Sequence, residues 1–281
     1  MDRRTFLARS GAAALAMAAS PLRALASGYD ERLLILIELK GGNDGLNTVV
    51  PYSDRNYARL RPRLSIPRDQ VLPLDERIGL HPSLEPLLAL WRADELALVQ
   101  GVGYPEPNLS HFRSIEIWDT ASDSRETLRD GWLGRVFSRR PAPRRYAADG
   151  VVIGSHELGP LSGTAARAIS LNSVERFEMQ ARYAKDRAPA GNAALDHVLK
   201  VERDVAAAAA GLARAPVPSA EYPRGEFGSS LRTACRVLAS ADVAAIRLTL
   251  NGFDTHQNQA GVHANLLEQL AQGIIALSSV L

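Results

Sequence analysis

Residues 33–39 read LLILIEL, and residues 40–45 continue as KGGNDG. A continuous apolar run of strand length that ends at glycines is typical of a strand buried on both faces, which is the position of a central strand in a parallel sheet. Similar strand patterns follow at 151–154, 168–171 and 243–250, with helical patterns between them. Strands that alternate with helices predict an α/β fold, with a mostly parallel sheet flanked by helices.

Helical apolar spacing is present in six segments, which are 83–92, 110–120, 172–185, 193–214, 231–240 and 262–280. The apolar run at 96–102 has the length of another strand. In contrast, residues 51–80 are rich in Pro and Arg and predict an irregular excursion. Residues 215–228 predict a loop, and residues 251–259 predict a polar turn.

The composition of the chain is that of a globular protein. Of its 281 residues, 46% are hydrophobic and 23% are charged, which excludes the disordered and collagen-like classes. Cys235 is the single cysteine, so an intramolecular disulfide and a multi-cysteine zinc or iron–sulfur site are both excluded. Arginine dominates the 33 basic residues, a bias that we attribute to codon usage.

Residues 1–26 have the pattern of an export signal. An arginine pair at 3–4 precedes an alanine-rich apolar stretch at 11–20 and the small-x-small pattern of a signal-peptidase site at 24–26. The segment resembles a twin-arginine signal peptide. Its apolar stretch is far shorter than the ~20 residues that span a bilayer, so we expect no stable membrane anchor. The alternative is a solvated basic helix start.

The leader predicts the twin-arginine export machinery as a partner, a periplasmic or extracellular location, and a mature domain at 27–281. Removing it takes away four of the 33 basic and one of the 31 acidic residues, which leaves 29 and 30 and a net charge of −1. A chain so close to neutral offers polyanions no broad basic surface. No nucleic-acid partner is therefore expected.

Two polar clusters directly follow predicted strands, where ligands gather in open α/β sheets. The first contains Asp44, and the second contains Asp254 and His256, with His263 shortly after it. One carboxylate with two imidazoles suits zinc, manganese or iron. The alternatives are an Asn-Asp-Gly turn around Asp44 and a surface role for His263 near a helix start.

A third candidate is Ser110 with His111, at the start of a predicted helix. Helix-start amides favour negative charge, which helps a serine hydroxyl to act as a nucleophile, with the neighbouring histidine as base or metal ligand. The alternative is that Ser110 only caps the helix. A Ser-His-Asp hydrolase is a further alternative, although the chain has no Gly-x-Ser-x-Gly elbow.

Three motifs carry a resemblance to a known family. LKGGNDGLNTVVPY at 39–52, SHF at 110–112 and GFDTH at 252–256, with the twin-arginine leader, resemble the exported bacterial family named domain of unknown function 1501. This family is grouped with the alkaline phosphatase and sulfatase superfamily. The resemblance implies an alkaline-phosphatase-like fold that holds one or two divalent metals at the carboxyl ends of its strands, and a Ser or Thr nucleophile at a helix start.

Carried over by position, Asp44 corresponds to the first metal aspartate of the superfamily, and Asp254 with His256 to its Asp/His ligand pair. The spacing here is Asp-x-His, whereas the superfamily usually has Asp-x-x-x-His. The choice between His256 and His263 as the ligand therefore stays open.

The resemblance makes Ser110 the counterpart of the nucleophile, with His111 and Ser114 as alternatives. Family members normally continue into a Ser-Glu-Phe-Gly segment and a Thr-Asp-His-Gly motif, so the end at Leu281 implies that the C-terminal part of the fold is incomplete. The expected function is a metal-dependent hydrolase of phosphate or sulfate esters. The alternatives are a non-catalytic periplasmic or cell-surface binding protein and an inactive truncated fragment.

Overall fold

The centre of the molecule is a four-stranded parallel sheet with the strand order β1-β7-β5-β6. The computed structural model describes residues 32–163, 166–171, 192, 195, 215–216 and 218–281. The strands are β1 (Leu34–Lys40), β5 (Ala148–Ile153), β6 (Ala168–Leu171) and β7 (Val243–Asn251). The α/β class, the parallel sheet and the four strands expected at these positions are confirmed.

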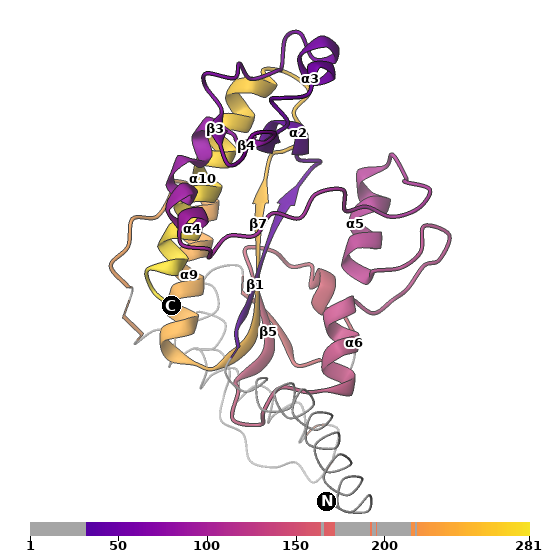
Figure 1. Cartoon of the computed structure of the whole chain (residues 1–281). Coiled ribbons are helices and arrows are strands. Elements are labelled where there is room, and N and C mark those ends of the chain that lie inside the picture. The colour runs from indigo at the N-terminus through magenta and orange to yellow at the C-terminus, as the bar shows by residue number, and fades with distance from the viewer. Residues whose placement is uncertain (1–31, 164–165, 172–191, 193–194, 196–214, 217) are drawn as a thin grey trace, which may run out of the picture.

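Helices cover both faces of the sheet (Figure 1). One layer packs its apolar side chains on the main core and consists of η1 (Pro82–Leu87), α4 (Leu88–Arg92), α9 (Glu226–Ser240) and α10 (Gln259–Ser278). The opposite layer consists of α5 (His111–Thr120), α6 (Trp132–Arg139) and the short η2 (Gly159–Leu161). The helices predicted near α5, α9 and α10 are confirmed, whereas α6 was not predicted.

The segment expected to be an irregular excursion folds into a small subdomain at one end of the sheet (Figure 1). Its elements are α2 (Gly45–Thr48), β2 (Val49–Val50), α3 (Arg55–Leu60), β3 (Leu72–Pro73) and β4 (Gly79–Leu80). Tyr57 organises it, because the ring packs with Val50 and Val71 in a separate buried cluster. Its hydroxyl donates to Asn47 Oδ1 and accepts from the Ile66 N–H, each at 2.8 Å.

One short apolar run forms no strand, and one strand prediction was wrong in part. Residues 96–102 form no strand, and Val99 is 80% exposed there. Strand β1 is not central: in the described part of the chain it pairs with β7 alone, and most of its residues are only half-buried. Its second face carries Leu36, Glu38 and Lys40 into a pocket instead of a core.

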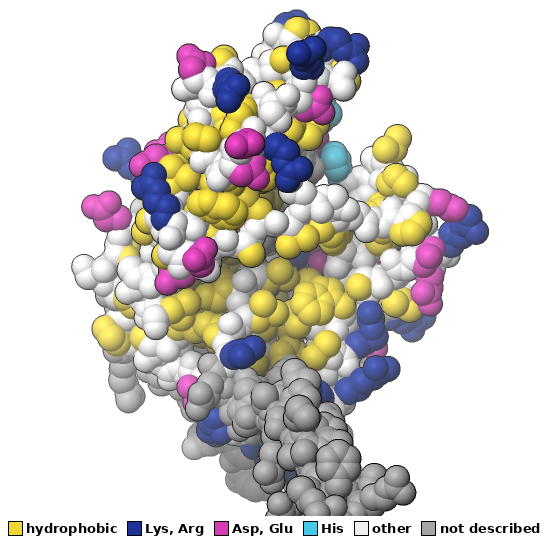
Figure 2. Space-filling model, in the orientation of Figure 1, with side chains coloured by type: hydrophobic (Ala, Val, Ile, Leu, Met, Phe, Trp, Pro, Cys, Tyr) yellow, Lys and Arg dark blue, Asp and Glu magenta, His cyan; other side chains and the backbone are white. Residues whose placement is uncertain are grey.

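Several expectations lie outside the described residues. These are the leader at 1–26 and the helices at 172–185 and 193–214. The described helices include none with the length and apolar character needed to cross a membrane. Figure 2 shows hydrophobic side chains gathered over the middle of the visible face, between the α10 layer and the α5 layer of Figure 1.

Replacing Tyr57 by Phe should destabilise the fold measurably. The change leaves the amide of Ile66 and the side-chain oxygen of Asn47 without their partner in a buried place. We expect the free energy of unfolding, measured in urea, to fall by about 1–3 kcal/mol. The matched control is Tyr52→Phe, whose hydroxyl bonds to the exposed carbonyl of Asp75. An equal loss in both variants would contradict the role given to Tyr57.

Candidate functional site

The carboxyl ends of β1 and β7 lie side by side, and this contact joins the two polar clusters. Lys40 is in register with Asn251, and the Phe253 N–H donates to the Lys40 carbonyl at 3.2 Å. Gly41 has a φ of +113°, and a Cβ placed there would lie 2.6 Å from the backbone nitrogen of Asp254. Only glycine lets the two loops approach this closely.

Three of the predicted site residues meet at this edge. The Nε2 atom of His256 lies 3.0 Å from Asp254 Oδ1, and the Nε2 atom of His111 lies 3.4 Å from the same oxygen. The His111 ring also covers Gly42, where a Cβ would come within 3.0 Å of its Cε1 atom. The group is open to solvent, since His111 and Asp254 are about half exposed and His256 is 83% exposed.

Asp44 is close by but engaged elsewhere. It caps α2 by accepting from the Asn47 N–H at 3.2 Å, and it forms a two-point ion pair with Arg61. Gln259 also donates to it, at 2.5 Å. Burial raises the pKa of the Asp44 carboxyl, but Arg61, the Asn47 N–H and His263 together lower it by more, so the pKa lies below its ordinary value.

His263 is buried rather than on the surface, with 3% of its area exposed. Its Nε2 atom lies 2.9 Å from Asn43 Oδ1, and its ring stands edge-on to His81 and Phe253. Burial lowers the pKa of His263, which keeps the ring neutral. Asn43 in turn bonds to Thr48, so His263 holds the loop after β1 in place.

Ser110 stands at the N-cap of α5, yet its side chain makes no capping hydrogen bond. Its backbone N–H donates to Asn108 Oδ1 at 2.8 Å, and the residue is exposed. Ser114, the alternative nucleophile, faces the pocket, where its Oγ lies 2.7 Å from the Tyr104 hydroxyl. The reading of Ser110 as a simple helix cap therefore gains no support from its side chain.

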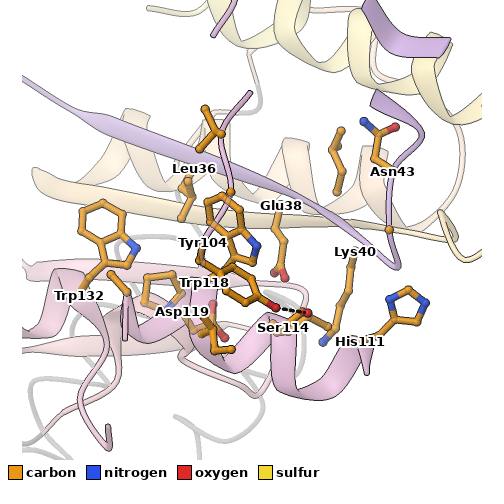
Figure 3. A pocket seen from close by; sticks show the side chains of 18 of the residues that line it. Leu36, Glu38, Lys40, Asn43, Tyr104, His111, Ser114, Trp118, Asp119 and Trp132 are labelled. Carbon is orange, nitrogen blue, oxygen red and sulfur yellow. Dashed lines mark hydrogen bonds between the residues drawn. The ribbon is translucent and has the colours of Figure 1, made fainter. Parts of the chain in front are cut away.

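A pocket of about 970 Å³ lies between β1 and the α5–α6 layer (Figure 3). His111, Gly42 and Asn43 line one end, and Trp132 lines the other. Apolar side chains form much of its wall, and these are Leu36, Val102, Ile115, Ile117, Trp118 and Trp132. This volume and lining are typical of sites that bind small molecules.

A cluster of charges lies inside this pocket. Arg247 of β7 is 2% exposed and forms an ion pair with Glu38 of β1. It also donates from Nη1 to the Glu157 carbonyl at 2.7 Å, and its Nη2 lies 3.8 Å from Asp119 Oδ1. Gly159 makes room for the guanidinium, because a Cβ there would lie 2.6 Å from Arg247 Cζ.

The pKa of Asp119 is unusual. Burial raises it to about 6, with Arg247 opposing the shift and Glu38 adding to it. Asp119, Glu38 and Arg247 were not predicted as site residues from the sequence. Glu38 and Arg247 could have been noticed, because each is a charged residue inside an apolar strand pattern. A charged residue in such a place is rarely buried without a partner.

The expected metal set is not assembled as predicted. In the described residues, no group of three or more His, Cys, Asp and Glu side chains has the arrangement of a metal site. Asp44 is held by Arg61, and His263 is held by Asn43. The trio of His111, Asp254 and His256 has the donor types that zinc, manganese or iron accept, although both imidazoles contact the carboxylate itself.

The fold and the site define an α/β protein with a ligand-sized pocket between β1 and the α5–α6 layer, one end of which reaches the carboxyl edge of the sheet. Residues 77–281, more than half of the chain, match the family described as Protein of unknown function (DUF1501), and the chain belongs to this family. The match begins after the 39–52 motif. No curated protein and no solved structure matches the chain.

Acid should destabilise the packing beneath this site. Burial and, to a lesser extent, the charge of His263 lower the pKa of His81 from 6.5 to about 4. The unfolded chain therefore binds this proton at a higher pH than the folded chain, so stability is lost as the pH falls from 6.5 towards 4.

The variant His81→Asn keeps a side-chain acceptor for the Ser83 N–H that Nδ1 of His81 binds at 3.0 Å. We expect it to lose about 3 kcal/mol less free energy of unfolding than the wild type between pH 6.5 and 4, in urea titrations. His156→Asn, at an exposed position, serves as the control. Parallel pH profiles for the wild type and His81→Asn would refute the prediction.

Proposed function

We propose that this protein is an exported hydrolase of phosphate or sulfate esters, with its reacting centre at His111, Asp254 and His256. The observation that carries the proposal is the contact of Asp254 with both His111 and His256, since His111 also lines one end of the 970 Å³ pocket. The leader supports export to the periplasm or the extracellular space by the twin-arginine machinery. The resemblance to the alkaline phosphatase and sulfatase superfamily supports the class of ester.

The chemistry follows from the positions of the groups. An imidazole on a carboxylate can take a proton from an attacking hydroxyl and return it to the leaving alcohol. His111 is the first residue of α5, where backbone amides favour the negative charge that develops on an ester oxygen. The apolar wall of the pocket holds the alcohol part of the ester and excludes water from it.

Ser110 is the proposed nucleophile, because its hydroxyl makes no capping hydrogen bond and the residue directly precedes His111. Ser114 is less suited, since its hydroxyl is bonded to both Tyr104 and the Asn108 carbonyl.

Asp254, His111 and His256 have donor types that a divalent metal accepts, and they would hold one only after moving from the arrangement that the structure shows. Such a metal would polarise the ester oxygen and lower the pKa of a bound water. Asp44 and His263 then have a supporting role in this proposal. Asp44 anchors the loop after β1 to Arg61, and His263 anchors the same loop to α10 through Asn43.

A non-catalytic periplasmic or cell-surface binding protein is the second candidate. The observation that favours it is the engagement of Asp44 by Arg61 and Gln259, which removes one expected metal ligand. In that case the pocket binds its ligand and releases it unchanged.

The test uses the purified full chain with p-nitrophenyl phosphate and p-nitrophenyl sulfate, alone and with zinc, manganese or iron. We expect turnover in at least one condition. The variant Asp254→Asn should lower kcat/KM by at least about 100-fold, because it removes the carboxylate that both imidazoles contact. Metal content of each protein is measured in parallel.

The control is Asp69→Asn, which changes an exposed carboxylate outside the site. Undiminished turnover in Asp254→Asn would place the chemistry elsewhere. Absence of turnover in every condition would refute the hydrolase and leave the binding protein as the function.

A further inference from the structure

Two carboxylates, Glu38 and Asp119, and two cations, Lys40 and Arg247, line the pocket, but both cations make their closer ion pairs with carboxylates other than Asp119. Glu38 is paired with Arg247, and Glu157 is paired with Lys40 at 3.0 Å. This leaves the carboxylate of Asp119. Within the described residues, the one basic nitrogen within 4 Å of it is Arg247 Nη2, at 3.8 Å, and that guanidinium is already bonded to Glu38 and to the Glu157 carbonyl.

Two indole rings line the same pocket as this carboxylate. Trp118 precedes Asp119 on α5 and is 53% exposed, and Trp132 begins α6. Figure 3 shows both indoles with Asp119 in the part of the pocket away from His111. Asp119 enters from the helix wall, and Glu38 enters from the strand wall.

A carboxylate whose nearest cation is 3.8 Å away, in a pocket lined by indole rings, favours one class of ligand. The face of a Trp ring attracts organic cations, more strongly than Tyr or Phe does, and the attraction grows when the cation leaves water. The Asp119 carboxylate adds a full opposite charge. An anionic group is disfavoured at this end, because it would meet both Asp119 and Glu38.

We propose that the inner end of the pocket binds an organic ammonium group against Asp119, Trp118 and Trp132. Combined with the ester site at His111, this defines the substrate as an amino-alcohol or quaternary-ammonium ester of phosphate or sulfate. The ester half of this substrate rests on the proposed function. The ammonium half does not, since it concerns binding alone.

The pH dependence of binding has a definite sign. The pKa of Asp119 is about 6, raised mainly by burial, and a bound cation favours the ionised carboxylate. Affinity for an ammonium ligand should therefore be full above pH 6 and fall as Asp119 becomes protonated below it. The charged groups that face Asp119 are Arg247 from β7, Glu38 and Lys40 from β1, and Glu157 from the loop after β5.

The experiment is calorimetric titration of the full chain with benzyltrimethylammonium, and with benzyl alcohol as the neutral aromatic probe. At pH 8 we expect the cation to bind at least tenfold more tightly than the alcohol, and to lose about tenfold in affinity at pH 5. The variant Asp119→Asn should bind the cation at least tenfold more weakly. Equal affinities for the two probes, or no effect of Asp119→Asn, would overturn the proposal.

Two controls keep the result clear. Glu116→Gln removes a carboxylate on the same helix that is paired with Arg113 and lies outside the pocket, so cation affinity should stay unchanged. Asp119→Asn should fold and melt at or above the wild-type temperature at pH 8, because an Asp with a raised pKa destabilises the fold once it is ionised. Since no ester is hydrolysed here, a failed hydrolase test leaves this result standing, and the reverse also holds.

Discussion

The parallel pairing of β1 with β7 is the constraint on which the rest of the molecule depends. These two strands lie more than 200 residues apart in the sequence, yet their register carries them to the same edge of the sheet, from Leu34 beside Ala245 to Lys40 beside Asn251. The Phe253 N–H then closes onto the Lys40 carbonyl, and Gly41 lets the loops touch. Everything proposed for Asp254 and His256 follows from this contact.

The same pairing also builds the pocket. Alternate residues of a strand point to opposite faces. Glu38 and Lys40 therefore lie on the pocket face of β1, and Ile35, Ile37 and Leu39 lie on the core face. Arg247 lies on the corresponding face of β7 and binds Glu38 there. A fold that keeps ionisable groups in such a place gives up stability that apolar side chains would supply, which is common where a site serves binding or catalysis.

The parallel sheet could be predicted from the sequence, because its strands have apolar patterns of strand length that alternate with helical patterns. The sequence was also sufficient to place Asp44 and Asp254 after two strands of one sheet. It could not show that Asp44 is engaged, since its partner Arg61 comes from a proline-rich stretch without periodicity. The prediction that β1 is a central strand was wrong. A strand with one face on the core and the other on an apolar pocket has the same continuous apolar sequence as a strand buried on both faces.

The charged cluster in the pocket could not be predicted from local sequence patterns, for a related reason. Glu38, Asp119 and Arg247 come from three separate segments, and each alone reads as an ordinary charged residue. The contact of His111 with Asp254 likewise depends on how α5 packs against the sheet. Such contacts follow from tertiary packing and have no signature in the spacing of residues.

The most direct test of this account is a cysteine cross-link between the register partners at the end of β1 and β7. In the variant Lys40→Cys with Asn251→Cys, strand spacing of about 4.8 Å brings the two thiols within disulfide range, while native Cys235 is fully buried. We expect rapid oxidation to an intramolecular disulfide, seen by mass spectrometry. The control pair Lys40→Cys with Leu250→Cys, whose side chains point to opposite faces, should stay reduced. Free thiols in the first pair, or a disulfide in the control pair alone, would contradict the pairing from which the site is built.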